Sequence, residues 1–418
     1  MKAYLSSILL IFLTLSSFSQ SQPAQALSER FIQHFNAENP DSLYKTFSAE
    51  MKAAVSSEKL GVVIKQIKGL KGNLKKSEFY KKSDLAETYI LDFDSPGTVL
   101  LLNFNKNNEV IGFFIDQDKR KQEDGPNTVT ITTSGSVLKG TLEVPKVTAK
   151  VPVVLLIAGS GPTDRDGNSV LIAGKPNYFK LLDDQLVAKN IAVLRYDKRG
   201  VGASTTSKKQ EELVLEDFAE DASACIKFLK NDPRFSKIII AGHSEGALIG
   251  MIASSKEKPD AFISLAGPGL PLDEILKRQF KEALKAEDLK TGLQLIDSVK
   301  SGFQVNTKHN PVFESVFSAK LYPFVHSLLQ YNGSKELKKL KIPVLIVQGS
   351  TDLQVGQENA TLLKKAYPTA QLKIIEGMNH VLKEAPADRA KNLQTYSADL
   401  PLHPQLSSTI VQFVNSLK

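Results

Sequence analysis

The chain has 418 residues, of which 42% are hydrophobic and 23% are charged, and its formal net charge is +8. This length and composition are ordinary for a globular protein with one large domain and a smaller one. Acidic and basic residues alternate along most of the chain, and no Lys/Arg block is interleaved with aromatic residues. We therefore interpret the basic excess as a solvated surface and expect no nucleic-acid partner.

The first residues predict a secretory signal peptide over residues 1–19. Lys2 supplies a positive start, residues 4–15 are mostly apolar, and Ser17 and Ser19 place small residues where a signal peptidase cuts. The apolar run is too short to span a bilayer, which favours cleavage over an uncleaved anchor. No cysteine lies near the cleavage point to carry a lipid. We expect a secreted or periplasmic protein with no stable membrane anchor after cleavage.

Residues 27–118 predict a small α+β domain. Apolar side chains fall on one helical face at Phe31, Ile32 and Phe35, and a second helical pattern covers residues 60–67. Strand-like runs follow over residues 77–80, 87–93, 98–104 and 110–115. The domain contains one histidine, His34, and no cluster of catalytic residues. A polar segment, residues 116–127, links it to the rest of the chain.

Residues 125–418 predict a mostly parallel sheet with helices on both faces. An antiparallel hairpin over residues 128–132 and 140–144 comes first. Short apolar runs then alternate with amphipathic helices, which is typical of buried parallel strands. These runs are residues 153–157, 191–196, 237–241, 261–265, 343–347 and 372–375. Residues from about 268 to 340 are helical and charged, and we interpret them as an inserted helical cap.

A G-x-S-x-G motif at residues 242–246 indicates the nucleophile. Residues 238–241 form a buried strand before it, and an apolar helical run follows, which is the strand–turn–helix context that this motif requires. Glycine at 242 and 246 avoids collisions of side chains with the neighbouring strand and helix. Ser244 is then exposed at the carboxyl end of a central strand.

A serine hydroxyl needs a base, and the base needs a carboxylate partner. His380 follows the last predicted strand, whereas its rival His403 lies in the C-terminal stretch, so we favour His380. Asp352 lies just beyond the strand at residues 343–347, and Ala266–Gly269, after the preceding strand, offers no acid. The order Ser244, Asp352, His380 is the order of an α/β-hydrolase triad.

The tetrahedral intermediate requires fixed N–H donors for its oxyanion. The backbone of Glu245, directly after the nucleophile, is the first candidate. The second lies in the loop after the first parallel strand, where we favour the N–H of Ser160, followed by that of Gly161.

Three segments carry a resemblance to a known family. They are residues 159–168 (GSGPTDRDGN), residues 195–204 (RYDKRGVGAS) and residues 400–404 (LPLHP). They resemble bacterial EstD-type carboxylesterases, and the resemblance implies an α/β-hydrolase fold preceded by a small α+β domain. It departs at Glu245, where many relatives carry Gln or Met, and an acid beside the oxyanion is a candidate determinant of pH dependence or substrate preference.

Other motifs are given simpler interpretations. Asp164-Arg165-Asp166 is interpreted as a loop braced by its own ion pairs rather than as a substrate-binding group. Residues 199–202 lack the third glycine and the acid of a nucleotide-binding loop, and no H-E-x-x-H or Cys/His cluster is present, so we expect no cofactor and no metal. Cys225, the only cysteine, is interpreted as core packing rather than as a nucleophile.

These observations predict a serine hydrolase that cleaves small carboxylic esters through an acyl-enzyme intermediate. An aminopeptidase would use the same triad but would need carboxylates that hold a substrate ammonium. The cap offers such acids at Asp273, Glu274, Glu287 and Asp288. A thioesterase or acyltransferase, and a non-catalytic binding protein on a hydrolase fold, are the remaining alternatives.

Overall fold

The computed structural model describes residues 22–83, 86–95, 97–118, 125–169, 174–307 and 310–417. The chain divides into two compact units, Met1–Asp116 and Gln117–Lys418. The predicted signal peptide and residues 119–124 of the predicted linker lie outside the described residues. Among the residues that are described, no helix combines the length and the apolar character needed to cross a membrane.

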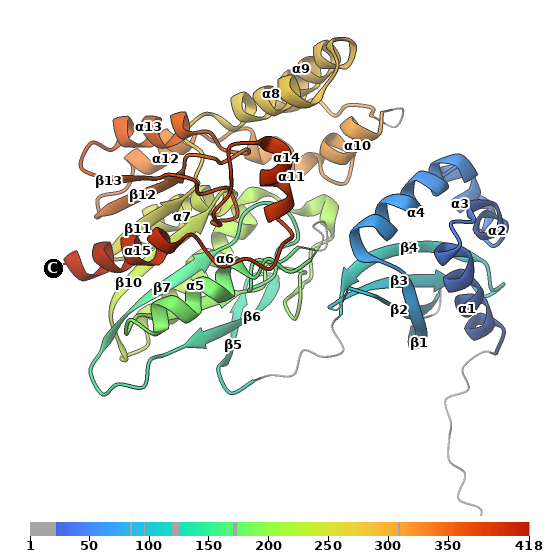
Figure 1. Cartoon of the computed structure of the whole chain (residues 1–418), viewed down its shortest axis with the longest axis horizontal. Coiled ribbons are helices and arrows are strands. Elements are labelled where there is room, and N and C mark those ends of the chain that lie inside the picture. The colour runs from blue at the N-terminus through green and yellow to red at the C-terminus, as the bar shows by residue number, and fades with distance from the viewer. Residues whose placement is uncertain are drawn as a thin grey trace, which may run out of the picture. The chain divides into compact units, whose positions relative to one another are not determined.

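The first unit packs four helices against an antiparallel sheet (Figure 1). The helices are α1 (Gln22–Asn36), α2 (Pro40–Lys45), α3 (Ala49–Ala54) and α4 (Ser57–Lys71). The strands lie in the order β1 (Leu74–Lys82), β2 (Glu87–Phe93), β3 (Thr98–Phe104) and β4 (Val110–Gln117). Phe31, Phe35 and Ile64 lie buried in one cluster with Leu91 and Leu100. Helix α1 begins at Gln22, ahead of residue 27, where the sequence placed the start of this domain.

The second unit is built on one large sheet with the order β13-β12-β11-β10-β7-β8-β6-β5, and β9 pairs with β6. Its strands are β5 (Thr128–Thr133), β6 (Ser136–Glu143), β7 (Val151–Ile157), β8 (Ala192–Tyr196), β9 (Thr205–Thr206), β10 (Phe235–His243), β11 (Ala261–Leu265), β12 (Val344–Gly349) and β13 (Gln371–Ile375). Strands β8, β7, β10, β11, β12 and β13 are mutually parallel. The predicted mostly parallel sheet is confirmed, and the short strand β9 was not expected.

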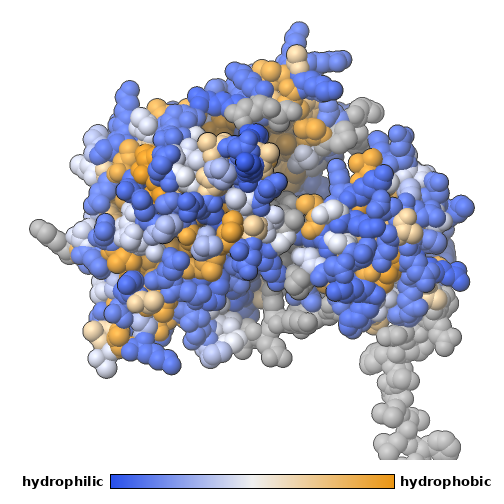
Figure 2. All heavy atoms as spheres, in the orientation of Figure 1, coloured by the Kyte–Doolittle hydropathy of each residue, from blue (hydrophilic) through white to orange (hydrophobic). Residues whose placement is uncertain are grey.

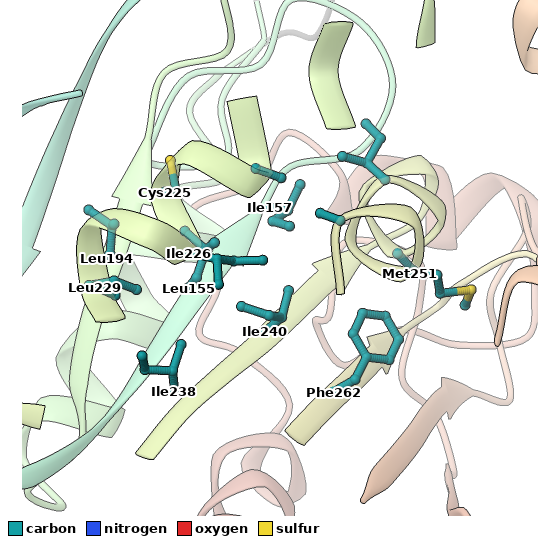
Figure 3. Close-up of a cluster of buried hydrophobic side chains, with 14 of the residues drawn as sticks. Leu155, Ile157, Leu194, Cys225, Ile226, Leu229, Ile238, Ile240, Met251 and Phe262 are labelled. Carbon is teal, nitrogen blue, oxygen red and sulfur yellow. The ribbon is translucent and has the colours of Figure 1, made fainter. Parts of the chain in front are cut away.

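Helices cover both faces of this sheet. Helices α6 (Leu215–Lys230), α7 (Glu245–Glu257) and α13 (Gln357–Ala366) contribute to one buried cluster, and α5 (Tyr178–Val187) and α15 (Pro404–Ser416) contribute to the other. Figure 3 shows Cys225 among the apolar side chains of the first cluster. Cys225 is fully buried, and burial raises the pKa of its thiol well above the ordinary value. Its predicted packing role is confirmed.

Residues 268–340 contain a run of helices and, in the part that is described, none of the strands named above. The helices are α8 (Leu272–Ala283), α9 (Ala286–Lys300), α10 (Pro311–Phe317), α11 (Tyr322–Leu328) and α12 (Gly333–Lys338), and a short α14 (Arg389–Thr395) follows β13. Helices α8 and α9 run side by side (Figure 1). Phe280, Ile296 and Phe317 form a small core of their own. Hydrophilic residues cover most of the face shown in Figure 2, with smaller apolar areas between them.

Candidate active site

Ser244 lies at the turn between strand β10 and helix α7. Its backbone has φ 55° and ψ −125°, a conformation in which side-chain-bearing residues are strained by roughly 1–3 kcal/mol. The turn is held from both sides: the Ser244 N–H donates to the Leu265 carbonyl at 2.9 Å, and its carbonyl accepts from the Ala247 N–H at 2.9 Å. The strand β11 and the first turn of α7 therefore fix the position of the serine.

The glycines of the motif have the steric role that the sequence predicts. A Cβ on residue 242 would lie 2.2 Å from the carbonyl oxygen of Gly246. A Cβ on residue 246 would lie 2.2 Å from the carbonyl oxygen of Ile157, the last residue of β7. Backbone oxygens cannot yield as flexible side-chain ends do. Helix α7 can approach the sheet this closely only because both positions lack a side chain.

The structure brings Asp352 and His380 together. The His380 Nδ1 lies 2.8 Å from the Asp352 Oδ2, and both side chains are almost entirely buried. An ionised carboxylate only accepts hydrogen bonds, so the neutral imidazole that acts as a base carries its N–H on Nδ1 and its lone pair on Nε2. Within the described residues, no hydrogen bond joins the Ser244 hydroxyl to His380. This contact is often long in hydrolases without a bound substrate.

Asp352 is kept ionised by its neighbours. Burial raises the pKa of the carboxyl, but the charge and hydrogen bond of His380 and the N–H groups of Val355 and Gln354 outweigh it, so the pKa lies below its ordinary value. The Gln354 and Val355 N–H groups donate to Oδ1 at 2.8 and 2.9 Å. The Gln348 amide donates to Oδ2 at 3.1 Å. The loop after β12 thus holds a charged acceptor against His380.

The two other histidines near the site have structural contacts. His243 Nε2 lies 2.8 Å from the His380 carbonyl oxygen, and its ring packs against those of Tyr178 and His380, with centroids 5.2 and 4.8 Å away. His243 therefore packs and hydrogen-bonds beneath the turn that carries Ser244. His403 forms the N-cap of α15, where its Nδ1 accepts from the Gln405 N–H at 3.3 Å.

His243 links stability of the second unit to pH. Burial, followed by the nearby His380, lowers its pKa from 6.5 to about 3. Between these pH values the unfolded chain binds a proton that the folded chain does not, so stability falls as pH falls, by up to about 1.4 kcal/mol per pH unit from this group. We expect His243→Gln, which keeps an N–H donor, to flatten this slope between about pH 6 and pH 4.

Cys225 provides the readout for this prediction. It is the only cysteine of the chain and lies in the core of the second unit, so urea-induced exposure of its thiol to dithiodipyridine reports unfolding of that unit. His34→Gln, in the first unit, serves as the control and should keep the wild-type slope. An unchanged slope in His243→Gln would show that His243 titrates normally in the folded protein.

The loop after β7 approaches Ser244 as expected for an oxyanion loop. A Cβ on residue 159 would lie 3.0 Å from the Ser244 Cβ. Ser160 and Gly161 are exposed, and Gly161 has φ 80°. In the described part of the chain, the N–H groups of both residues donate to no protein acceptor. The N–H of Glu245 lies in the first turn of α7, where helical N–H groups have no partner within the helix.

Ion pairs stabilise the next part of this loop, residues 164–168, and the partner residues in these pairs lie outside the loop. The Arg165 guanidinium donates to Asp197 at 2.7 Å, and Asp166 pairs with Arg195 of β8. Asp164 accepts from the N–H groups of Asp166 and Asn168, at 2.9 and 2.8 Å. The interpretation of a loop braced by its own ion pairs is therefore corrected: the charge pairs connect it to β8 and the residues that follow. Spacing along the chain does not reveal such partners.

Three supporting residues were missed from the sequence. Lys198 pairs with Glu245, and the Gln348 amide donates to Asp352. The buried Asn379 accepts from the Lys383 N–H at 3.0 Å and donates to Thr395 at 2.7 Å. These two hydrogen bonds fix the loop that carries His380. Lys198 follows strand β8, Gln348 lies near the end of β12, and Asn379 directly precedes His380. A lysine or an amide at such a position is the signal by which the sequence could have revealed them.

A cavity of about 270 Å³ adjoins the Asp352 loop. Ile275 and Arg278 of α8 line it together with Asp352 and Asn359. Glu358 also lines it, and the Arg278 guanidinium pairs with that carboxylate at 2.7 Å. The helical insertion therefore contributes directly to a cavity beside the His380 partner.

The doubly covered parallel sheet and the strained serine between β10 and α7 define an α/β-hydrolase. The chain belongs to the hydrolase family described as serine aminopeptidase, S33, which matches residues 176–385. Residues 28–113 match a family described as a protein of unknown function, DUF3887.

The chain is similar to two individual relatives and to a solved structure. Esterase EstD of Thermotoga maritima is 28% identical over 373 residues, which cover 84% of this chain and 86% of the relative. A proline iminopeptidase of Lactobacillus acidophilus is 24% identical over 263 residues, or 56% of this chain and 84% of the relative. The resemblance to EstD-type proteins is thus confirmed. Among solved structures, Est1E of Butyrivibrio proteoclasticus with bound ferulic acid is 19% identical, with a TM-score of 0.45, over 69% of this chain and 100% of that one.

Proposed function

We propose that the protein is a carboxylesterase that uses Ser244 as nucleophile, His380 as base and Asp352 as the partner of the base. The Ser244 oxygen attacks the ester carbonyl while His380 Nε2 takes its proton, and His380 then protonates the departing alcohol. Water, activated by the same imidazole, releases the acid from the acyl-enzyme. The N–H groups of Glu245 and Ser160 stabilise the oxyanion, with Gly161 as the alternative donor.

The observation that carries this proposal is the hydrogen bond from His380 Nδ1 to an ionised, buried Asp352. It leaves Nε2 as the basic nitrogen of a histidine that follows β13. The loops after β7, β10, β12 and β13 all follow the carboxyl ends of strands in the same parallel part of the sheet, in which β11 lies between β10 and β12. The proposed donors, nucleophile, acid and base are carried by these four loops.

The pairing of the carboxylates in the cap and in the cavity favours an ester over a substrate with a free amino terminus. An aminopeptidase needs an acid that can pair with the substrate ammonium. Asp273 pairs with Lys300 at 2.7 Å, and Glu274 with Lys277 at 3.3 Å. Glu358 in the cavity pairs with Arg278, and Asp288 accepts from the Asn310 amide at 3.2 Å. Of the cap acids singled out from the sequence, Asp273 is buried, and Glu274 and Glu287 are exposed.

An aminopeptidase is the second candidate, because the matched family is described as serine aminopeptidase and one relative is a proline iminopeptidase. A thioesterase would use the same nucleophile. A panel of p-nitrophenyl esters of increasing acyl length, acyl thioesters and aminoacyl anilides separates the three. We expect the short-chain esters to have the highest kcat/KM, and a higher value for an aminoacyl anilide would assign the protein to the peptidases.

We further propose that the protein acts outside the cytoplasm after loss of residues 1–19. The positive start, the short apolar run and the small residues before Gln20 support this location. Expression of the full chain should yield a mature protein that begins at Gln20 in the secreted or periplasmic fraction. An intact Met1 end on the soluble protein would contradict the proposal.

A further inference from the structure

Glu245 makes contacts that its backbone role does not require. Its carboxylate is buried, with 4% of the side chain exposed, directly after the strained Ser244. Oε2 accepts from the Ser160 hydroxyl at 3.0 Å, and Oε1 lies 3.3 Å from the Lys198 ammonium, whose side chain is 7% exposed. A side chain at the start of α7 thus reaches across to the loop after β7.

Lys198 completes the contact with the same loop. Its ammonium donates to the Gly159 carbonyl at 2.9 Å and lies 4.8 Å from the centre of the Phe218 ring. The loop is therefore held at two adjacent residues: the carbonyl of Gly159 by Lys198, and the hydroxyl of Ser160 by Glu245. The Lys198 ammonium also neutralises the Glu245 carboxylate. Without this neutralisation, the carboxylate would repel the negative charge that develops on the substrate oxygen beside Ser244.

These contacts matter because the two proposed oxyanion donors lie on separate elements. One is the Glu245 N–H at the start of α7, and the other is the Ser160 N–H on an exposed loop with a glycine on each side. Donors act in the transition state only if they are fixed before the charge develops. Here the residue that provides the first donor also holds, through its side chain, the residue that provides the second.

We propose that the side chain of Glu245, paired with Lys198, is a positioning residue that sets the Ser160 N–H in the oxyanion hole. This inference rests on the proposed function of Ser244, but it concerns the geometry of the oxyanion hole and applies to esters and amides alike. The carboxylate acts through Ser160 and the ion pair. It takes no proton from the substrate and forms no covalent bond.

The test uses kinetics that separate the transition state from the bound substrate. In Glu245→Ala we expect kcat to fall about 10–100-fold, with KM within about threefold, because oxyanion donors act on the transition state. Affinity for an alkylboronic acid, which forms a tetrahedral adduct with the serine, should fall by a similar factor. Glu245→Gln should recover most of both values, because its amide still reaches Lys198 and Ser160.

Ser160→Ala removes only the loop contact and leaves the buried ion pair intact. We expect a several-fold loss of kcat and of boronate affinity at unchanged Tm, and little additional loss in the Glu245→Ala background, because both changes break the same connection. Ser160→Ala also carries the test if Glu245→Ala fails to fold. Glu257→Ala, at the other end of α7 and paired with Lys227 at 3.4 Å, is the matched control and should retain wild-type kinetics.

The rate at which a fluorophosphonate labels Ser244 distinguishes failure of this inference from failure of the proposed function. Labelling needs the nucleophile and the oxyanion hole but no ester substrate. A wild-type protein that is labelled but cleaves no ester would overturn the esterase proposal alone. The positioning role of Glu245 would be overturned if Glu245→Ala and Ser160→Ala both kept the labelling rate and the boronate affinity of the wild-type protein.

Discussion

Ser244→Ala should lower kcat on a short-chain ester by about 10⁵-fold or more, the size of loss expected when the nucleophile of a triad is removed. The variant should also lose covalent labelling by a fluorophosphonate. Alanine removes only the oxygen and keeps the Cβ, so the turn between β10 and α7 should retain its contacts with Leu265 and Ala247. Substrate affinity, measured by the Kd of a product acid, should remain near the wild-type value.

The control for this prediction is Ser254→Ala. Ser254 is a buried serine on the same helix, and its hydroxyl has no hydrogen-bond partner among the described residues. This variant should keep both activity and labelling. Persistent labelling of Ser244→Ala would move the nucleophile to another residue and remove the basis for the catalytic assignment.

Asp352→Asn should cost about 10⁴-fold in kcat, because an amide in place of the carboxylate disrupts the tautomer of the histidine. The amide NH₂ would face His380 Nδ1 as a donor, which moves the imidazole proton to Nε2 and leaves no base for Ser244. The Asn oxygen still accepts from Gln354 and Val355. Activity should therefore fall far more than stability, as measured by kcat together with urea unfolding.

Asp388→Asn is a suitable control for this substitution. Asp388 caps α14, where its carboxylate accepts from the Lys391 N–H at 2.9 Å, and asparagine caps helices about equally well. It should leave kcat unchanged. A loss of less than about tenfold in Asp352→Asn would assign the partner of His380 to a different acid.

The sequence was most informative where local pattern and backbone chemistry coincide. Short continuous apolar runs predicted the parallel strands to within two residues at each end, because strands buried on both faces must be continuously apolar. The glycines at 242 and 246 predicted close backbone approach, and the structure shows backbone oxygens at both positions. Chain order after β12 and β13 singled out Asp352 and His380, whose side chains form a hydrogen bond.

The sequence was least informative about side chains that meet across elements. Arg165 and Asp166 had no visible partners, because Asp197 and Arg195 lie on a neighbouring strand and the residues that follow it. Lys198 was unremarked for the same reason. Glu245 was noted as a departure from its relatives, but nothing in its neighbours along the chain indicated that its carboxylate would contact Lys198 and Ser160.

By itself the sequence determined the fold class, the strand–turn–helix around Ser244 and the candidates for acid, base and oxyanion donors. These depend on local periodicity, on glycine sterics and on the order of loops along a parallel sheet. Only the tertiary structure decided which charges are paired: the buried Asp352 with His380, and Glu245 with Lys198. A buried ion pair depends on the distance between atoms from distant segments, and packing of the sheet and its helices sets that distance.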